Sequence, residues 1–79
     1  MRIGFFGPLR DSLGDEREIA AEEGETVAGL RIRLAGLDPD ARDLLGPQVR
    51  ACVGDRIVGE DFRLDGQERV EFLPPLSGG

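Results

Sequence analysis

The sequence predicts an α+β fold, a mixed sheet of about five strands with one main helix across one face and a short second helix. Short segments near both ends of the chain alternate apolar and polar side chains, which is typical of half-buried strands. Between them lies a stretch whose apolar residues recur at helical spacing. The chain has 79 residues, which is room for a single domain.

The N-terminal segment is predicted to form two strands. The first covers residues 1–7, with Ile3 and Phe5 on one face and Gly4 and Phe6 on the other, and Gly7-Pro8 ends it. Residues 9–14 are expected to form a turn of helix or a loop, and residues 17–21 a second strand. The acidic residues 22–25 then read as a solvent-exposed connection.

The main helix is predicted to follow Thr26, a residue type that caps helix N-termini. Arg31 and Arg33 are expected to face outward. A second, short helix is predicted between Asp38-Pro39-Asp40, which resembles a helix start, and Gly46-Pro47, which resembles a stop. The side of the main helix that faces the core is expected to carry Val27, Leu30, Leu34 and Leu37.

Three strands are predicted in the second half of the chain, at residues 49–53, 57–58 and 70–73. A tight turn at Gly54-Asp55 or at Asp55-Arg56 joins the first two, and Asp65-Gly66 turns into the last. The predicted order is two strands, a helix across them and then further strands, which is the order of the ubiquitin-like β-grasp fold. In that fold the first and last strands lie side by side in the middle of the sheet.

The alternation also assigns the two faces of the sheet. The strongly apolar set should face the helix, and it comprises Ile3, Phe5, Val70 and Phe72. Phe6 and Leu73 then lie on the open face, with Ile57 near them. Scattered exposed apolar residues are ordinary, whereas several that converge beside the chain end mark a partner-binding patch. We favour the patch, with Phe6, Ile57 and Leu73 as its partner-binding residues.

The last residues, 74–79, are predicted to form an extended tail beyond a domain of residues 1–73. Pro74 and Pro75 have no backbone N–H for a sheet and fix φ, and Leu76, Ser77, Gly78 and Gly79 follow. Two terminal glycines alone would indicate only a frayed end. A strand, Pro-Pro and Gly-Gly in this order instead favour a side-chain-free arm that fits a narrow cleft, where its carboxylate can be activated as an acyl-adenylate.

Composition excludes several classes of function. The net charge of −6 disfavours nucleic acid and anionic membranes as partners. The chain has no histidine and a single cysteine, Cys52, so a Cys-His or Ser-His pair, an imidazole metal site and an internal disulfide are all ruled out. Cys52 is interpreted as a small packing residue. The absence of a signal-peptide pattern and the lone thiol favour a cytoplasmic protein.

Three stretches give the sequence a resemblance to the small subunit of molybdopterin synthase, a β-grasp sulfur carrier. IGFFGPLRDSLG is similar to the first strand of that family and the residues after it. Thr26-Val27 followed by Leu30 resembles its helix start, and VEFLPPLSGG closely resembles its last strand, Pro-Pro and terminal Gly-Gly. The sequence departs from the family where Gly54 replaces a more usual Asn and Leu73 a more usual aromatic residue.

The resemblance implies a mechanism. A ubiquitin-activating-like enzyme would use ATP to adenylate the Gly79 carboxylate, and a sulfur donor protein would displace AMP to leave a thiocarboxylate. The large synthase subunit would then receive the tail, in a heterotetramer, and transfer the sulfur to a cyclic pterin precursor. The carrier would bind no permanent cofactor and no metal, and the catalytic groups would belong to the large subunit.

Other functions remain open from the sequence. A sulfur carrier for thiazole synthesis and a protein-conjugating ubiquitin-like modifier share the Gly-Gly end. A non-enzymatic interaction domain is the rival from a different class. An iron–sulfur β-grasp protein is excluded because one cysteine cannot supply a cluster.

Overall fold

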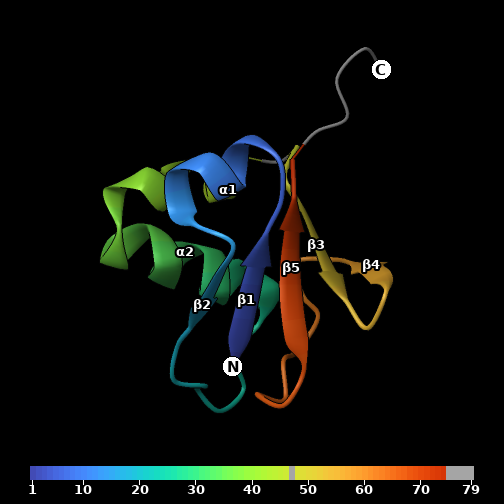
Figure 1. Ribbon diagram of the computed structural model, residues 1–79. Coiled ribbons are helices and arrows are strands. Elements are labelled where there is room, and N and C mark those ends of the chain that lie inside the picture. The colour runs from blue at the N-terminus through green and yellow to red at the C-terminus, as the bar shows by residue number, and fades with distance from the viewer. Residues whose placement is uncertain (47, 75–79) are drawn as a thin grey trace.

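The computed structural model describes residues 1–46 and 48–74, and it places a five-stranded mixed sheet beside a layer of helices (Figure 1). The strands are β1 (Arg2–Phe5), β2 (Glu16–Glu18), β3 (Arg50–Val53), β4 (Arg56–Val58) and β5 (Arg69–Leu73). The helices are α1 (Pro8–Leu13), α2 (Val27–Leu37) and the 3-10 helix η1 (Pro39–Leu45). The predicted α+β class, with one main helix and a short second one, is confirmed. Within the described ranges, no helix has the length and apolar character needed to cross a membrane.

The first and last strands are paired at the centre of the sheet, as predicted. The strand order is β2-β1-β5-β3-β4, and β1 runs parallel to β5 with Ile3 opposite Val70 and Phe5 opposite Phe72. The other neighbouring strands are antiparallel. β5 therefore has a paired strand on both sides up to Phe72, and Leu73, the last residue before Pro74, is still paired with Arg50 of β3.

The core lies between this sheet and α2, and the predicted faces are confirmed. Ile3, Phe5, Val70 and Phe72 are all at most 2% exposed, and the rings of Phe5 and Phe72 stack with centroids 6.2 Å apart. From α2, the core receives Val27, Leu30 and Leu34. Burying one such aliphatic or aromatic side chain contributes about 1.5–3 kcal/mol to stability.

The caps and turns follow the local sequence. The Thr26 hydroxyl accepts a hydrogen bond from the Gly29 backbone N–H at 3.2 Å, so it is the N-cap of α2. The turn between β3 and β4 consists of Gly54 and Asp55, with φ of 57° and 65°. Two successive residues with positive φ match the twist of a two-residue hairpin. Of the two turns that the sequence allowed, the structure therefore has the one at Gly54-Asp55.

Some boundaries differ from those predicted. β1 ends at Phe5, α1 is a regular helix, and β2 covers Glu16–Glu18 instead of residues 17–21. Leu37 was expected in the core but is 66% exposed, because it is the last residue of α2, where the chain turns into η1. The predicted stop at Gly46-Pro47 falls in part on Pro47, which lies outside the described residues.

Arg31 and Arg33 do not face outward, which corrects the expectation for α2. Arg31 is only 6% exposed, and its Nη1 donates to the Leu44 carbonyl oxygen at 2.6 Å. It lies four residues after Val27, so both belong to the same side of the helix. Arg33 is half-buried and donates two hydrogen bonds to Glu25, of 2.9 and 2.6 Å.

Candidate functional site

The candidate site is the end of β5, where the chain leaves the sheet toward the predicted tail. Leu73 and Pro74 are half-buried there. The chain after β1 passes close by, because a Cβ built on Gly7 would lie only 3.0 Å from Pro74 Cγ. Gly7 has a φ of 59°, so its backbone conformation and this close approach both favour glycine. Pro75, Leu76, Ser77, Gly78 and Gly79, the other predicted tail residues, lie outside the described residues.

The three predicted partner-binding residues are on the surface but are not equally close to this point. Phe6 is 39% exposed and follows Phe5, and Leu73 follows Phe72, so the paired ends of β1 and β5 bring these two residues together. Ile57 is 61% exposed on β4 and is paired with Cys52 of β3. Ile57 is thus separated from β5 by a whole strand.

The open face also carries a charged cluster that sequence reasoning missed. The Arg69 side chain extends from β5 across Gly4 of β1 and donates to the Glu16 carboxylate on β2. Its Nε donates to Glu71 Oε2 at 3.2 Å, and Arg2 Nε lies 3.9 Å from Glu16 Oε1. Hydrogen bonds to Glu16 and then to Glu71 raise the pKa of Arg69 above its usual value. A network of ion pairs therefore joins β5, β1 and β2 across the open face.

Gly4 gives the Arg69 guanidinium room in this network. A Cβ at that position would overlap Arg69 Nη2, so the guanidinium could not lie against the strand as it does without shifting. A glycine inside a strand often marks the close approach of another group. Gly4 between Ile3 and Phe5 was therefore the signal in the sequence, although it did not indicate which side chain would approach.

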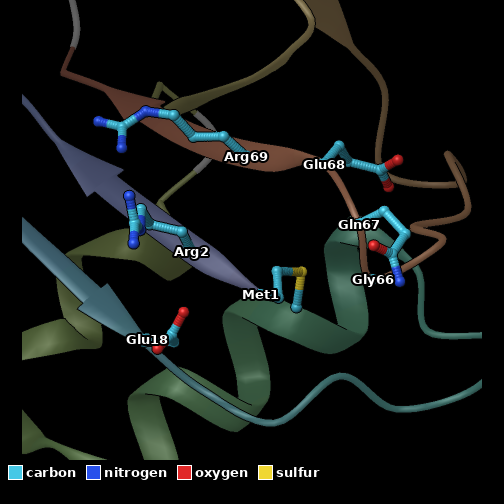
Figure 2. Close-up of a pocket in the computed structure, with 7 residues that line it drawn as sticks. All are labelled: Met1, Arg2, Glu18, Gly66, Gln67, Glu68 and Arg69. Atoms are coloured by element: carbon cyan, nitrogen blue, oxygen red, sulfur yellow. The ribbon is translucent and has the colours of Figure 1, made fainter.

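Two hollows adjoin the cluster. One, of about 480 Å³, lies beside Phe5 and Phe6 near the end of β1, and its other walls are Arg10, Asp15, Glu16 and Arg69. The second, of about 360 Å³, lies at the opposite end of β1 and β5. Figure 2 shows Arg2 and Arg69 on the strands beside it, and Gln67 and Glu68 on the loop that precedes β5. The first hollow is the one that lies near the candidate site.

The loop before β5 holds two carboxyl groups, Asp65 and Glu68, whose pKa values are shifted in opposite directions. Burial, and then the neighbouring Asp65, raise the pKa of Glu68. The hydrogen bond with Glu68, and then that from the Gln67 backbone, lower the pKa of Asp65. Both groups accept backbone hydrogen bonds within the loop, as the Asp65 N–H donates to Glu68 Oε1 at 2.6 Å. The pair therefore closes the turn at the end of the sheet away from Pro74.

The described part of the chain contains no group of three His, Cys, Asp or Glu side chains that could hold a metal ion. Cys52 is half-buried on the open face, with Glu71 and Ile57 opposite it on the neighbouring strands. It is placed between two strands, as a packing residue would be.

This architecture, with β1 and β5 parallel at the centre and α2 across one face, defines a ubiquitin-like β-grasp protein. The family model of the ThiS family matches residues 3–79, and the chain belongs to this family. The molybdopterin synthase sulfur carrier subunit of Escherichia coli (strain K12) is 30% identical over 80 residues, which cover 100% of this chain and 99% of that protein. The resemblance drawn from the sequence is thereby confirmed.

Solved structures share the fold at lower identity. SAMP1 from Haloferax volcanii superposes with a TM-score of 0.82 at 16% identity, covering 99% of this chain and 97% of that one. The putative molybdopterin converting factor, subunit 1, from Pyrococcus furiosus superposes with a TM-score of 0.76 at 24% identity, and the match covers 95% of each chain. A chain from the complex of subunits 1 and 2 of molybdopterin-converting factor from Helicobacter pylori superposes with a TM-score of 0.68 at 22% identity. The match covers 99% of this chain and 96% of that one.

Proposed function

We propose that this chain is the sulfur carrier subunit of a molybdopterin synthase. The observation that carries the proposal is the end-to-end match with the Escherichia coli sulfur carrier subunit, which includes the last strand and the residues after it. The position of β5 supports it. A central strand paired on both sides is a rigid base for a tail that must reach into another protein.

The proposed chemistry takes place at the Gly79 carboxylate. An activating enzyme joins this carboxylate to AMP from ATP and releases pyrophosphate, and the resulting acyl-adenylate is a good electrophile. Sulfur at the oxidation level of sulfide, supplied by a donor protein, then attacks the acyl carbon, the bond to AMP breaks, and a thiocarboxylate remains. In the synthase, the sulfur passes to the cyclic pterin precursor, and the carrier returns to its carboxylate form. ATP is consumed by the activating enzyme, and the carrier holds no cofactor of its own.

The proposed partner during sulfur transfer is the large subunit of the synthase, in a heterotetramer. The fold neighbour from Helicobacter pylori was solved as a complex of subunits 1 and 2 of molybdopterin-converting factor, which supports a partner of this kind. Phe6, Leu73 and Ile57 are the proposed apolar contacts, and Pro74 directs the tail away from them. We place these reactions in the cytoplasm, where ATP is available and thiols stay reduced.

The test is the intact mass of the protein after incubation with ATP, sulfide and the activating enzyme of its own organism. The mass should rise by the difference between one sulfur and one oxygen atom, and fragmentation should place the change at Gly79. Deleting Gly79 should abolish the change while thermal unfolding stays as in the wild type, since a terminal residue contributes little to folding.

Cys52→Ser is the matched control, and it should keep the full mass change. A change that maps to Cys52 would contradict the carrier mechanism. Isopeptide adducts on other proteins, without sulfur transfer, would instead indicate a ubiquitin-like modifier.

A further inference from the structure

The starting observation is how the ten arginines of the chain are paired. Six of them lie within 4.0 Å of a carboxylate, namely Arg2, Arg10, Arg17, Arg31, Arg33 and Arg69. Among the described side chains, which do not include that of Asp43, no such partner exists for Arg42, Arg50, Arg56 and Arg63. These four guanidinium groups are local positive charges in a chain whose net charge is −6.

Among these four, Arg50 has a distinct position. It is directly opposite Leu73 in the β3–β5 pair, and its exposed side chain lies on the face opposite that of the buried Ala51 and Val53. Arg42 belongs to η1, and Arg56 is opposite Val53, on the helix side of the sheet. Arg63 is outside the five strands and is bridged to Thr26, the N-cap of α2. In the described part of the chain, Arg50 is thus the unpaired cation of the open face, and it lies at the root of the tail.

A carboxylate lies near Arg50 but is already engaged. Glu71 is the diagonal neighbour of Arg50 across β3 and β5, a position from which long side chains can meet. Its carboxylate instead accepts from Arg69 Nε at 3.2 Å, while the remainder of the Arg69 guanidinium is held over Gly4 by Glu16. The charged network of the open face is therefore satisfied without Arg50, which leaves this guanidinium available to another molecule.

We propose that Arg50 is a specificity-determining contact, and that the large subunit places a carboxylate side chain against it when the tail enters. The proposal rests on the proposed function, since it names the chemistry of the surface that receives the tail. Arginine presents donors in a planar fork that matches a carboxylate. Charges at the rim of an interface steer association and fix its register more than they raise affinity. Arg50 would thus align the carrier while Leu73, beside it, supplies the apolar contact.

The experiment compares Arg50→Glu with Arg42→Glu by binding kinetics against the large subunit of the same organism. Both variants change the net charge of the chain from −6 to −8, so any long-range effect of charge is the same in both. Arg50→Glu should weaken binding roughly tenfold relative to Arg42→Glu, mainly through a slower association rate, and added salt should shrink the difference. Arg50→Lys should recover part of the loss. Thermal unfolding of each variant reports whether the fold is intact.

Each outcome decides a separate point. If the wild type binds and the two glutamate variants bind equally, the inference about Arg50 is wrong while the proposed function stands. Tighter binding of Arg50→Glu would also overturn it, because the partner would then be basic at that point. If the wild type itself does not bind the large subunit, the proposed function fails.

Discussion

Arg31 is a charged residue in the core, and its contacts explain how the fold tolerates it. Its guanidinium carbon lies 5.3 Å from the centroid of the Phe72 ring, and Nη2 donates to Glu60 Oε2 at 2.9 Å. Nε is 2.8 Å from Glu60 Oε1 but has no hydrogen bond, so that contact is ionic only. The Arg31 side chain thus links α2 to Leu44 of η1, to Glu60 in the segment after β4, and to the Phe72 ring of β5.

Removing the counterion of Arg31 should therefore destabilise the protein. Glu60→Ala would leave a buried guanidinium without a carboxylate, at an expected cost of about 1–2 kcal/mol in the free energy of unfolding. The value is below that of a fully buried pair, because the Glu60 side chain is 52% exposed. Urea unfolding measures the cost. Glu23→Ala, at an exposed residue in no described ion pair, is the control and should unfold as the wild type does.

The double variant Arg31→Met/Glu60→Ala separates charge from packing. Methionine keeps an apolar stem against Phe72 and needs no counterion. The double variant should therefore be more stable than the sum of its two single variants indicates. Additive effects would mean that Arg31 and Glu60 are not coupled.

At the scale of elements, the helices and strands with a strong apolar pattern were predicted correctly from the sequence. Strands whose position depends on pairing with a distant segment were misplaced. α2 begins at Val27 and β5 ends at Leu73, as expected, because helical and alternating periodicity are local properties. β2 is an edge strand of three charged residues, and its place is set by pairing with β1. No local pattern in Glu16–Glu18 encodes that pairing.

An ion pair that the sequence did not indicate joins the end of α2 to the sheet, between Arg17 of β2 and Asp38 at the C-cap. Arg17 Nη2 lies 2.5 Å from Asp38 Oδ2, and Asp38 Oδ1 accepts from the Asp40 N–H at 2.9 Å. The backbone hydrogen bond from Asp40, followed by the one from Arg17, lowers the pKa of Asp38 below its usual value. The folded state therefore favours the ionised carboxyl.

This shift predicts how stability depends on pH. Since the pKa is lower in the folded than in the unfolded chain, the contribution of Asp38 is complete above its unfolded pKa and is lost as pH falls through the folded pKa. Asp38→Asn should thus be modestly less stable than the wild type at neutral pH, and the difference should narrow as the pH falls below the ordinary aspartate pKa of about 3.9. Urea unfolding across this range tests it. Asp11→Asn, at an exposed residue of α1, is the control, and a gap that widens in acid would contradict the assignment.

At the scale of the whole molecule, the position of the candidate site was predicted from the sequence more completely than the residues that surround it. Alternation alone put Phe6 and Leu73 on the open face, and the strand order brought them together. The network of Arg69, Gly4 and Glu16, and the unpaired Arg50, follow from the pairing of β1, β2, β3 and β5 across the sheet. Such registers join residues far apart in the chain, so no local window of sequence contains them.

The last prediction is that the open face, and not the helix face, binds the large subunit, with Leu73 as an anchor. Leu73→Ala should weaken binding by about 2 kcal/mol, roughly thirtyfold, as truncation of an anchor near an interface centre does. Ile32→Ala is the matched control, since Ile32 is 66% exposed on α2 and loses an aliphatic side chain of the same size. It should bind as the wild type does.

Alanine is preferred to a charged residue at position 73. Leu73→Glu would place a carboxylate directly opposite Arg50 and would remove the apolar contact and the available guanidinium together. An acidic substitution at Arg33 is equally unsuitable as a control, because Arg33 is bound to Glu25 and its loss would disturb the fold. Calorimetric titration of Leu73→Ala and Ile32→Ala therefore compares the two faces alone. Weaker binding of Ile32→Ala would place the docking surface on the helices instead of the open sheet, and equal affinities would mean that Leu73 is not an anchor.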